Sequence, residues 1–502
     1  MNNHAFILPV LIPLIAAMLC VLLPTGNRAG RRVVGGLALL GTTAVAVGLV
    51  LLADTGAIGI YRFGNWPIPY GIIFLVDRLS ALMVLLCSTV GLIAFAHASV
   101  GPDRRSDHFP TLFLTLVAGV NGAFLTGDAF NLFVFFEILL LSAYILVVHG
   151  RAAARAQAGM QYVFLNLVGS ALFLVAVGML YGLTGTLNMA HMAVRVTELP
   201  PGDAALLRVG AVLMMVVFAI KSALFPVWSW LPRAYAASSA PVAAVFAIMT
   251  KVGVYAIIRY SGLIFGAGRG PVEDLVKPWL LPLALITTVV AIIAAVAARR
   301  LNVLASWLLI ASVGTILVGP GLFQDDGLAA GLYYMLHSTL AMAALFLVAD
   351  LIERQRGPEL GDSLVPGPAM PQQRLVGVLF MVTMVAVAGL PPLSGFLGKA
   401  LLLSAASQHP AAPAIFVILL GASFASLVVI SRAGSVLFWK TTDSPAPASA
   451  SITWKALPVS LLLLCILGLT LGAGPVSEYL DRTAAQVRDP SILIDAVLGE
   501  RP

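Results

Sequence analysis

The sequence predicts an all-α protein that crosses a membrane many times. Of its 502 residues, 60% are hydrophobic and only 10% are charged, and the mean hydropathy is +1.00. This composition is typical of chains whose apolar runs span a bilayer, not of soluble proteins. The polar stretches between the runs are short, so we expect residues 1–502 to form a single integral membrane domain.

About fourteen apolar runs are long enough to cross a bilayer as helices. The first run lacks the positive charges that begin a signal peptide, so we interpret it as a spanning helix. In chain order the expected helices occupy residues 4–24, 32–53, 72–98, 109–126, 128–148, 158–183, 205–231, 239–263, 277–297, 301–319, 327–353, 374–406, 412–438 and 453–472.

The basic residues predict which loops face the cytoplasm. One set of alternate loops carries most of the arginines, and the opposite set holds acids such as Asp54, Asp128 and Asp325. Because basic loops remain cytoplasmic, both termini are expected outside. The basic set comprises Arg28, Arg31, Arg32, Arg104, Arg105, Arg151, Arg155, Arg233, Arg299, Arg300, Arg354, Arg356, Arg374, Arg432, Lys440 and Lys455.

Charge and cysteine usage exclude other classes. The net charge of +7 reflects this loop bias, and no basic patch interleaved with aromatic residues indicates nucleic-acid binding. The three cysteines lie far apart inside apolar runs, without disulfide or metal-ligand spacing. No phosphate loop, HExxH, CxxC, GxSxG or dinucleotide motif is present, so we expect no cofactor.

Prolines interrupt the seventh and the twelfth expected helices. Pro226 follows Lys221 by five residues, whereas Pro391 and Pro392 come shortly before Lys399. Proline removes a backbone donor, so each helix is expected to break near the middle of the membrane. Broken helices in corresponding halves mark transporter binding sites and inverted repeats. The lysine precedes one break and follows the other, which is the mirrored order that inverted repeats produce.

Four charged residues lie inside the apolar helices: Glu137, Lys221, Lys251 and Lys399. A charge near the bilayer centre costs at least about 2.5–3.5 kcal/mol, so such residues usually have a function. Glu137 has no charged neighbour in its own segment, VFFEILLLSAY, and needs a lysine or water nearby to remain ionised.

His337 is a fifth candidate. A lone histidine in an apolar helix is often a satisfied core residue, but its near-neutral titration suits a proton relay. The neighbouring Ser338 and Thr339 would extend the same polar file with water.

Three other charged residues are interpreted as structural. Asp77 opens its helix beside Arg78, which predicts an interfacial ion pair, and Arg259 lies toward a helix end as an expected interfacial anchor.

The chemistry of these groups is proton transfer. Burial among apolar side chains favours the neutral form of an amine, and a nearby carboxylate favours the charged form. Glu137, Lys221, Lys251, His337 and Lys399, separated by water, therefore predict a switchable proton route. The driving force must come from an ion gradient or from a partner.

The segments FEILLLSAYIL, FAIKSALFPVWSWLPRAYAASSAPVAAVFAIMTKVGVYAIIR and LPPLSGFLGKALLL resemble the antiporter-like subunits shared by Mrp-type cation/proton antiporters and respiratory complex I. The resemblance runs from about residue 70 to 440. It implies fourteen helices, two inverted five-helix repeats at 109–263 and 277–438, and a bacterial inner-membrane protein with both termini outside.

Within this family the chain is most similar to the D subunit of the Mrp (Pha, Mnh) antiporter. TKVGVYAIIR and the arginine of WLPRAYAASSAP favour it, because Trp228 and Arg233 stand where complex I subunits usually have His and Asp. The resemblance implies that Glu137 pairs with Lys221, that Lys251 is a relay and that Lys399 is the terminal group. His337 departs from the pattern, since Ser338 holds the usual histidine place and Met342 replaces a lysine found in many members.

Three functions remain open from the sequence. The first is a proton-translocating subunit of a hetero-oligomeric Na⁺(K⁺)/H⁺ antiporter that works only with its sister subunits. The second is a proton-pumping subunit of a respiratory NADH:quinone or hydrogenase-type complex. The third is a membrane enzyme or a structural scaffold, for which no acid/base cluster near an interface is found.

Overall fold

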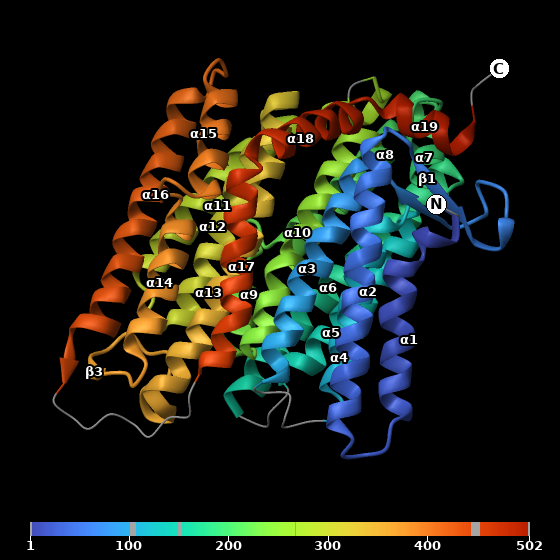
Figure 1. The fold of residues 1–502 in the computed structure, drawn as a ribbon. Coiled ribbons are helices and arrows are strands. Elements are labelled where there is room, and N and C mark those ends of the chain that lie inside the picture. The colour runs from blue at the N-terminus through green and yellow to red at the C-terminus, as the bar shows by residue number, and fades with distance from the viewer. Residues whose placement is uncertain (1–2, 101–106, 149–152, 267, 443–451, 500–502) are drawn as a thin grey trace.

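The computed structural model describes residues 3–100, 107–148, 153–266, 268–442 and 452–499. Long helices stand side by side in one bundle, and both ends of the chain lie toward the same end of it (Figure 1). The prediction of an all-α membrane protein is confirmed. Eleven helices of the described residues are long and apolar enough to cross a membrane: α2 (Arg28–Asp54), α3 (Arg78–Ser99), α5 (Ala129–Val148), α6 (Ala153–Thr184), α8 (Ala204–Ser222), α10 (Ala240–Leu263), α11 (Lys277–Val296), α12 (Leu301–Gly321), α13 (Asp325–Leu360), α16 (Ala412–Gly434) and α17 (Thr453–Leu471).

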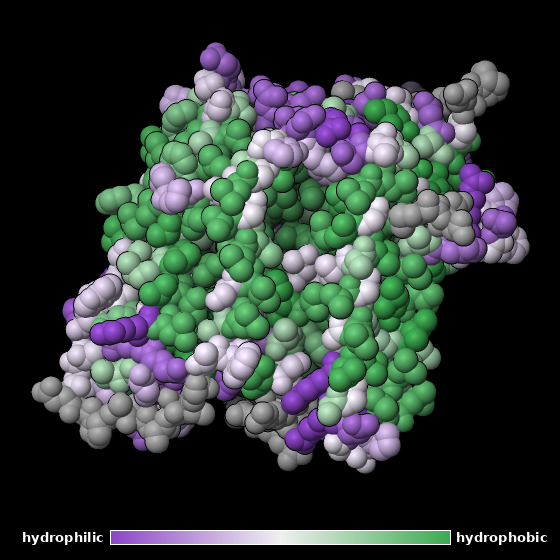
Figure 2. Space-filling model, viewed as in Figure 1, coloured by the Kyte–Doolittle hydropathy of each residue, from purple (hydrophilic) through white to green (hydrophobic). Residues whose placement is uncertain are grey.

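The remaining helices are shorter. Four of them are apolar: α1 (Leu8–Leu22), α4 (Phe109–Leu125), α14 (Gln373–Ala388) and α15 (Ser394–Ala406). The others are α7 (Met189–Arg195), α9 (Leu231–Ala237), α18 (Ala473–Arg488) and α19 (Pro490–Leu498). Figure 2 shows a broad hydrophobic band across the middle of the visible face, with hydrophilic side chains gathered toward its two ends. This is the surface of a multi-pass membrane protein.

The two expected helix breaks are present. The seventh expected helix, 205–231, ends early: α8 stops at Ser222, and residues 223–230 separate it from α9, which begins at Leu231. The twelfth divides into α14 and α15 around residues 389–393. Ala223 and Gly389, which follow the first half of each helix, both have left-handed backbone conformations. Lys221 lies in the last turn of α8, and Lys399 lies in the second turn of α15.

The expected helix at 72–98 is wrong at its start. Residues Ile73–Val76 form strand β2, which pairs antiparallel with β1 (Gly59–Arg62). Branched and aromatic side chains favour a strand here. Helix α3 then begins after Asp77, whose carboxylate accepts a hydrogen bond from the Ser80 backbone in a capping box. A second, two-residue pair joins β3 (Gly367–Pro368) to β4 (Thr441–Thr442).

Helices α18 and α19 cross the end of the bundle at which the chain termini lie (Figure 1). Arg482 of α18 contacts Asp54 at 3.1 Å, and Arg488 contacts Asp325 at 2.5 Å. Two acidic loops of the set expected outside thus lie at the same end. Arg104, Arg105 and Arg151, which contributed to the predicted orientation, lie outside the described residues.

The expected pairing of Asp77 with Arg78 is wrong. Asp77 is buried and forms a two-pronged ion pair with Arg259 of α10, with N–O distances of 2.6 and 2.9 Å. Arg259 is therefore not an interfacial anchor but a buried partner, because the fold brings α3 against α10. Arg78 instead donates to the Asp54 carbonyl oxygen at 3.0 Å.

Candidate functional site

Glu137, Ser170 and Lys221 meet in the first half of the bundle. The Ser170 hydroxyl of α6 donates a short hydrogen bond to Oε1 of Glu137 on α5. The Lys221 amine donates to the same hydroxyl oxygen at 3.5 Å and lies 5.5 Å from the centre of the Phe136 ring. The carboxylate and the amine therefore meet through a hydroxyl group and not as a direct ion pair.

Local contacts hold the break beside Lys221. The Trp230 indole N–H donates to the Ile220 carbonyl oxygen at 3.1 Å, and the Phe225 backbone N–H donates to Thr287 at 3.0 Å. These bonds occupy backbone groups that the broken helix leaves without helical partners. A Cβ atom at Gly253 would lie 2.5 Å from the Ser222 hydroxyl, so only glycine lets α10 pack this closely on the break.

Lys251 lies near the middle of α10 and is fully buried. Its amine makes no hydrogen bond to any other group that the structure describes. Unpaired buried charges are expensive, so the group has no stabilising role that would explain its presence.

His337 of α13 lies against the second break. Its Nε2 is 3.0 Å from the Ala386 carbonyl oxygen near the end of α14, and its Nδ1 is 2.8 Å from the Ser394 hydroxyl at the start of α15. A carbonyl oxygen only accepts, so Nε2 carries the proton and Nδ1 is free to accept one in the neutral ring. The ring thus connects both halves of the broken helix.

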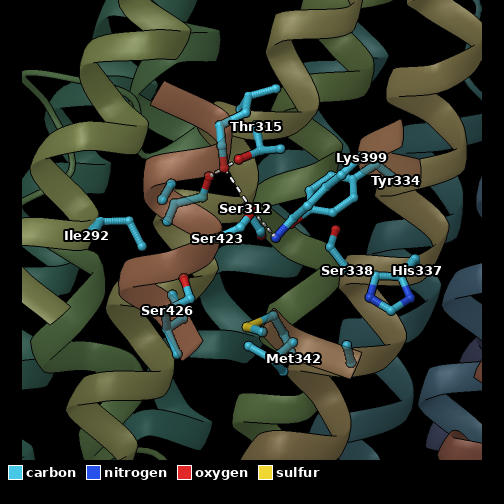
Figure 3. A pocket seen from close by; sticks show the side chains of 16 residues that line it. Ile292, Ser312, Thr315, Tyr334, His337, Ser338, Met342, Lys399, Ser423 and Ser426 are labelled. Atoms are coloured by element: carbon cyan, nitrogen blue, oxygen red, sulfur yellow. Dashed lines mark hydrogen bonds between the residues drawn. The ribbon is translucent and has the colours of Figure 1, made fainter. Parts of the chain in front are cut away.

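Lys399 lies beside the same break. Its amine donates to the Ala388 carbonyl oxygen and to the Ser423 hydroxyl of α16, both at 2.9 Å. Ala388 is the last residue of α14, where the partial negative charge of the helix end favours a cation. A small cavity next to the amine is also lined by His337, Ser338 and Met342 (Figure 3).

The helices that carry these groups form a continuous series, in which each helix contacts the next. Contacts join α5 to α6, α6 to α8, α8 to α10, α10 to α13, α13 to α15 and α15 to α16. The structure brings Glu137 close to Lys221, and it places His337 and Lys399 on one cavity; Lys251 stands alone between the two groups. The sequence reasoning missed Ser170, Ser394 and Ser423. The sequence signal that could have identified Ser170 was a single hydroxyl residue in an otherwise apolar segment, LVGSALFL.

The fold and the site define a class: a multi-pass membrane protein with two broken helices and a line of buried titratable groups. Residues 126–428 match the family model described as NADH:quinone oxidoreductase/Mrp antiporter, TM. The chain is 37% identical to the D subunit of a probable K⁺/H⁺ antiporter of Rhizobium meliloti, covering 99% of this chain and 98% of that protein. It is 35% identical to the D subunit of the Na⁺/H⁺ antiporter of Alkalihalophilus pseudofirmus, over 99% and 100% of the two chains.

A solved structure agrees with these relatives. A chain of the Mrp complex from Dietzia sp. superposes with a TM-score of 0.86 at 28% identity, covering 99% of this chain and 100% of that chain. The chain therefore belongs to the NADH:quinone oxidoreductase/Mrp antiporter family, and within it to the Mrp-type D subunits. The family resemblance predicted from the sequence is confirmed.

Proposed function

We propose that this protein is the proton-translocating subunit of a multi-subunit Na⁺(K⁺)/H⁺ antiporter. The observation that carries the proposal is the Glu137–Ser170–Lys221 contact, in which a hydroxyl joins a carboxylate to an amine inside the membrane domain. Hydroxyl groups both donate and accept, so they can pass a proton between two such groups. Two relatives are named as subunits of K⁺/H⁺ and Na⁺/H⁺ antiporters, which supports monovalent cations as the exchanged ions.

The proposed route runs through Glu137, Lys221, Lys251, His337 and Lys399. The continuous packing of the helices that carry these residues supports it. Water completes the steps on either side of Lys251, and the cavity that His337 and Lys399 share supports the last step. The charge of each amine changes the proton affinity of the next group in the route. A charge that moves closer or further away therefore makes that group bind or release a proton.

The proposed topology has about fourteen spanning segments, with residues 109–263 and 277–438 as inverted repeats and both termini outside. Each proposed repeat contains one broken helix with a lysine beside the break. Sister subunits of the same membrane complex complete the antiporter, which the likeness to subunits of multi-subunit antiporters supports.

The experiment is Lys221→Ala in the complete complex, assayed as cation-dependent ΔpH in everted membrane vesicles. Loss of exchange is expected, whereas Lys277→Ala, which changes an exposed lysine paired with Asp274, should exchange normally. Full exchange by Lys221→Ala would remove this residue from the mechanism. Co-purification with flavin and iron–sulfur subunits would instead assign the chain to a respiratory complex.

A further inference from the structure

The cavity beside Lys399 has the size and lining of an ion site. It has a volume of about 20 Å³ and lies between α12, α13, α15 and α16. This is room for about one water-sized body. Six side-chain hydroxyl groups line it (Figure 3): Ser312, Thr315, Tyr334, Ser338, Ser423 and Ser426.

Four of these hydroxyl groups use their protons in hydrogen bonds within their own helices. Each donates to a carbonyl oxygen of its own helix, at 2.7 Å for Ser312, 3.0 Å for Thr315, 3.3 Å for Ser338 and 2.8 Å for Ser423. A hydroxyl group has one proton and two lone pairs, so only lone pairs remain for other neighbours. These four oxygens therefore present acceptors to their other neighbours, which suits a cation.

Ser426 provides a second, independent observation. It lines the cavity, is only 7% exposed and lies one turn from Ser423 on α16. Within the described part of the chain its hydroxyl group makes no hydrogen bond. Ser426 thus lines the cavity with a hydroxyl group that no described protein group occupies, so its proton and its lone pairs are available to a ligand there.

The contacts of the Lys399 amine indicate how this cavity stabilises a positive charge. It is held by the Ser423 and Ala388 oxygens at 2.9 Å and lies 5.9 Å from the centre of the Tyr334 ring. Oxygen dipoles and an aromatic face stabilise an ammonium group and an alkali cation alike. No carboxylate is found among the described residues that line the cavity, so a divalent ion lacks its preferred ligands.

We propose that this cavity binds a dehydrated monovalent alkali cation in exchange for the proton of Lys399. The inference rests on the proposed function and assigns a cation site to the same subunit. The proton leaves the Lys399 ammonium group along the relay through His337, which also lines the cavity. The cation then enters beside the neutral amine, and the net charge of the cavity stays at one. Return of the proton expels the cation.

The test uses the complete complex in proteoliposomes and measures proton flux against Na⁺ and K⁺ concentration. Ser426→Ala and Ser312→Ala each remove one oxygen, so we expect the half-saturating cation concentration to rise by roughly five- to tenfold. Ser431→Ala, on the same helix but outside the cavity, is the matched control and should leave it unchanged. Size-exclusion chromatography establishes that each variant assembles.

A binding measurement separates this inference from the proposed function. Equilibrium binding of radioactive Na⁺ or Rb⁺ to the purified complex should be tighter for Lys399→Ala than for the wild type, because the competing ammonium group is gone. Unchanged half-saturation with a lower maximal rate would mean that the cavity holds water only and would overturn the proposal. Unchanged binding in Lys399→Ala would also overturn it. Absence of cation-dependent proton flux in the wild-type complex would instead refute the proposed function.

Discussion

Ser170→Ala tests the first step of the relay. The substitution removes the hydroxyl group that donates to Glu137 and accepts from Lys221, and it leaves the two charged groups without their shared neighbour. Ser170 is only 5% exposed, so bulk water does not replace the lost group directly.

The structure gives the expected size of the effect. A hydrogen bond to a charged group contributes about 1.5–3 kcal/mol. If proton transfer depends on this contact, the barrier rises by a similar amount, and each 1.4 kcal/mol is about tenfold in rate. We therefore expect cation/proton exchange to fall by roughly tenfold to a hundredfold.

The assay is the rate of cation-induced ΔpH collapse in everted vesicles that contain equal amounts of the assembled complex. Ser306→Ala is the matched control, because among the described residues the hydroxyl group of this buried serine bonds only to the Asn302 carbonyl oxygen of its own helix. Ser170→Thr retains the hydroxyl group and should restore most of the rate. Exchange at the wild-type rate in Ser170→Ala would show that the hydroxyl group is not part of the route.

Two further predictions concern stability. Arg259→Met leaves the buried Asp77 unpaired, so the thermal midpoint of the purified complex should fall by the equivalent of about 3–5 kcal/mol; the double variant with Asp77→Asn should recover part of the loss, and no recovery would contradict the ion-pair account. Burial raises the pKa of Asp128, in the loop just before α5, to about 6. Because the folded-state pKa is raised, the ionised form destabilises the fold, and the stability that the neutral form provides is lost as pH rises through 6. Asp128→Asn, which stays neutral and can still cap α5, should therefore raise the thermal midpoint at pH 8 by the equivalent of up to about 3 kcal/mol and leave it unchanged near pH 4; an equal shift at both pH values would refute this.

The sequence predicted the features that local chemistry determines. Proline cannot continue a helix, so Pro226 and the Pro391–Pro392 pair located both breaks. Lysines are rare inside apolar helices, so Lys221, Lys251 and Lys399 were recognisable without a structure. The start of α3 was misplaced because the apolar residues 73–76 suit a strand as well as a helix.

The contacts between distant segments were not predictable from one sequence. Asp77 and Arg259 are separated by 182 residues, and the neighbour of Asp77 in the chain, Arg78, offered a closer but incorrect partner. Nothing in the sequence distinguishes Ser170 from other serines in helices; its role depends on the fold, which places it between Glu137 of α5 and Lys221 of α8. The hydrogen bonds of His337 depend on backbone oxygens exposed by the break, which no residue pattern reveals.

Lys251 tests the central claim most directly, because it alone connects the two halves of the proposed route. Lys251→Met replaces a buried, unpaired amine by an apolar side chain of similar length, so the complex should assemble with an undiminished thermal midpoint. Lys440→Met, at an exposed position, is the matched control. The account predicts that cation/proton exchange by the assembled Lys251→Met complex falls by at least about tenfold, the effect of a barrier about 1.4 kcal/mol higher. Exchange at the rate of the control would contradict a single proton route through these five residues.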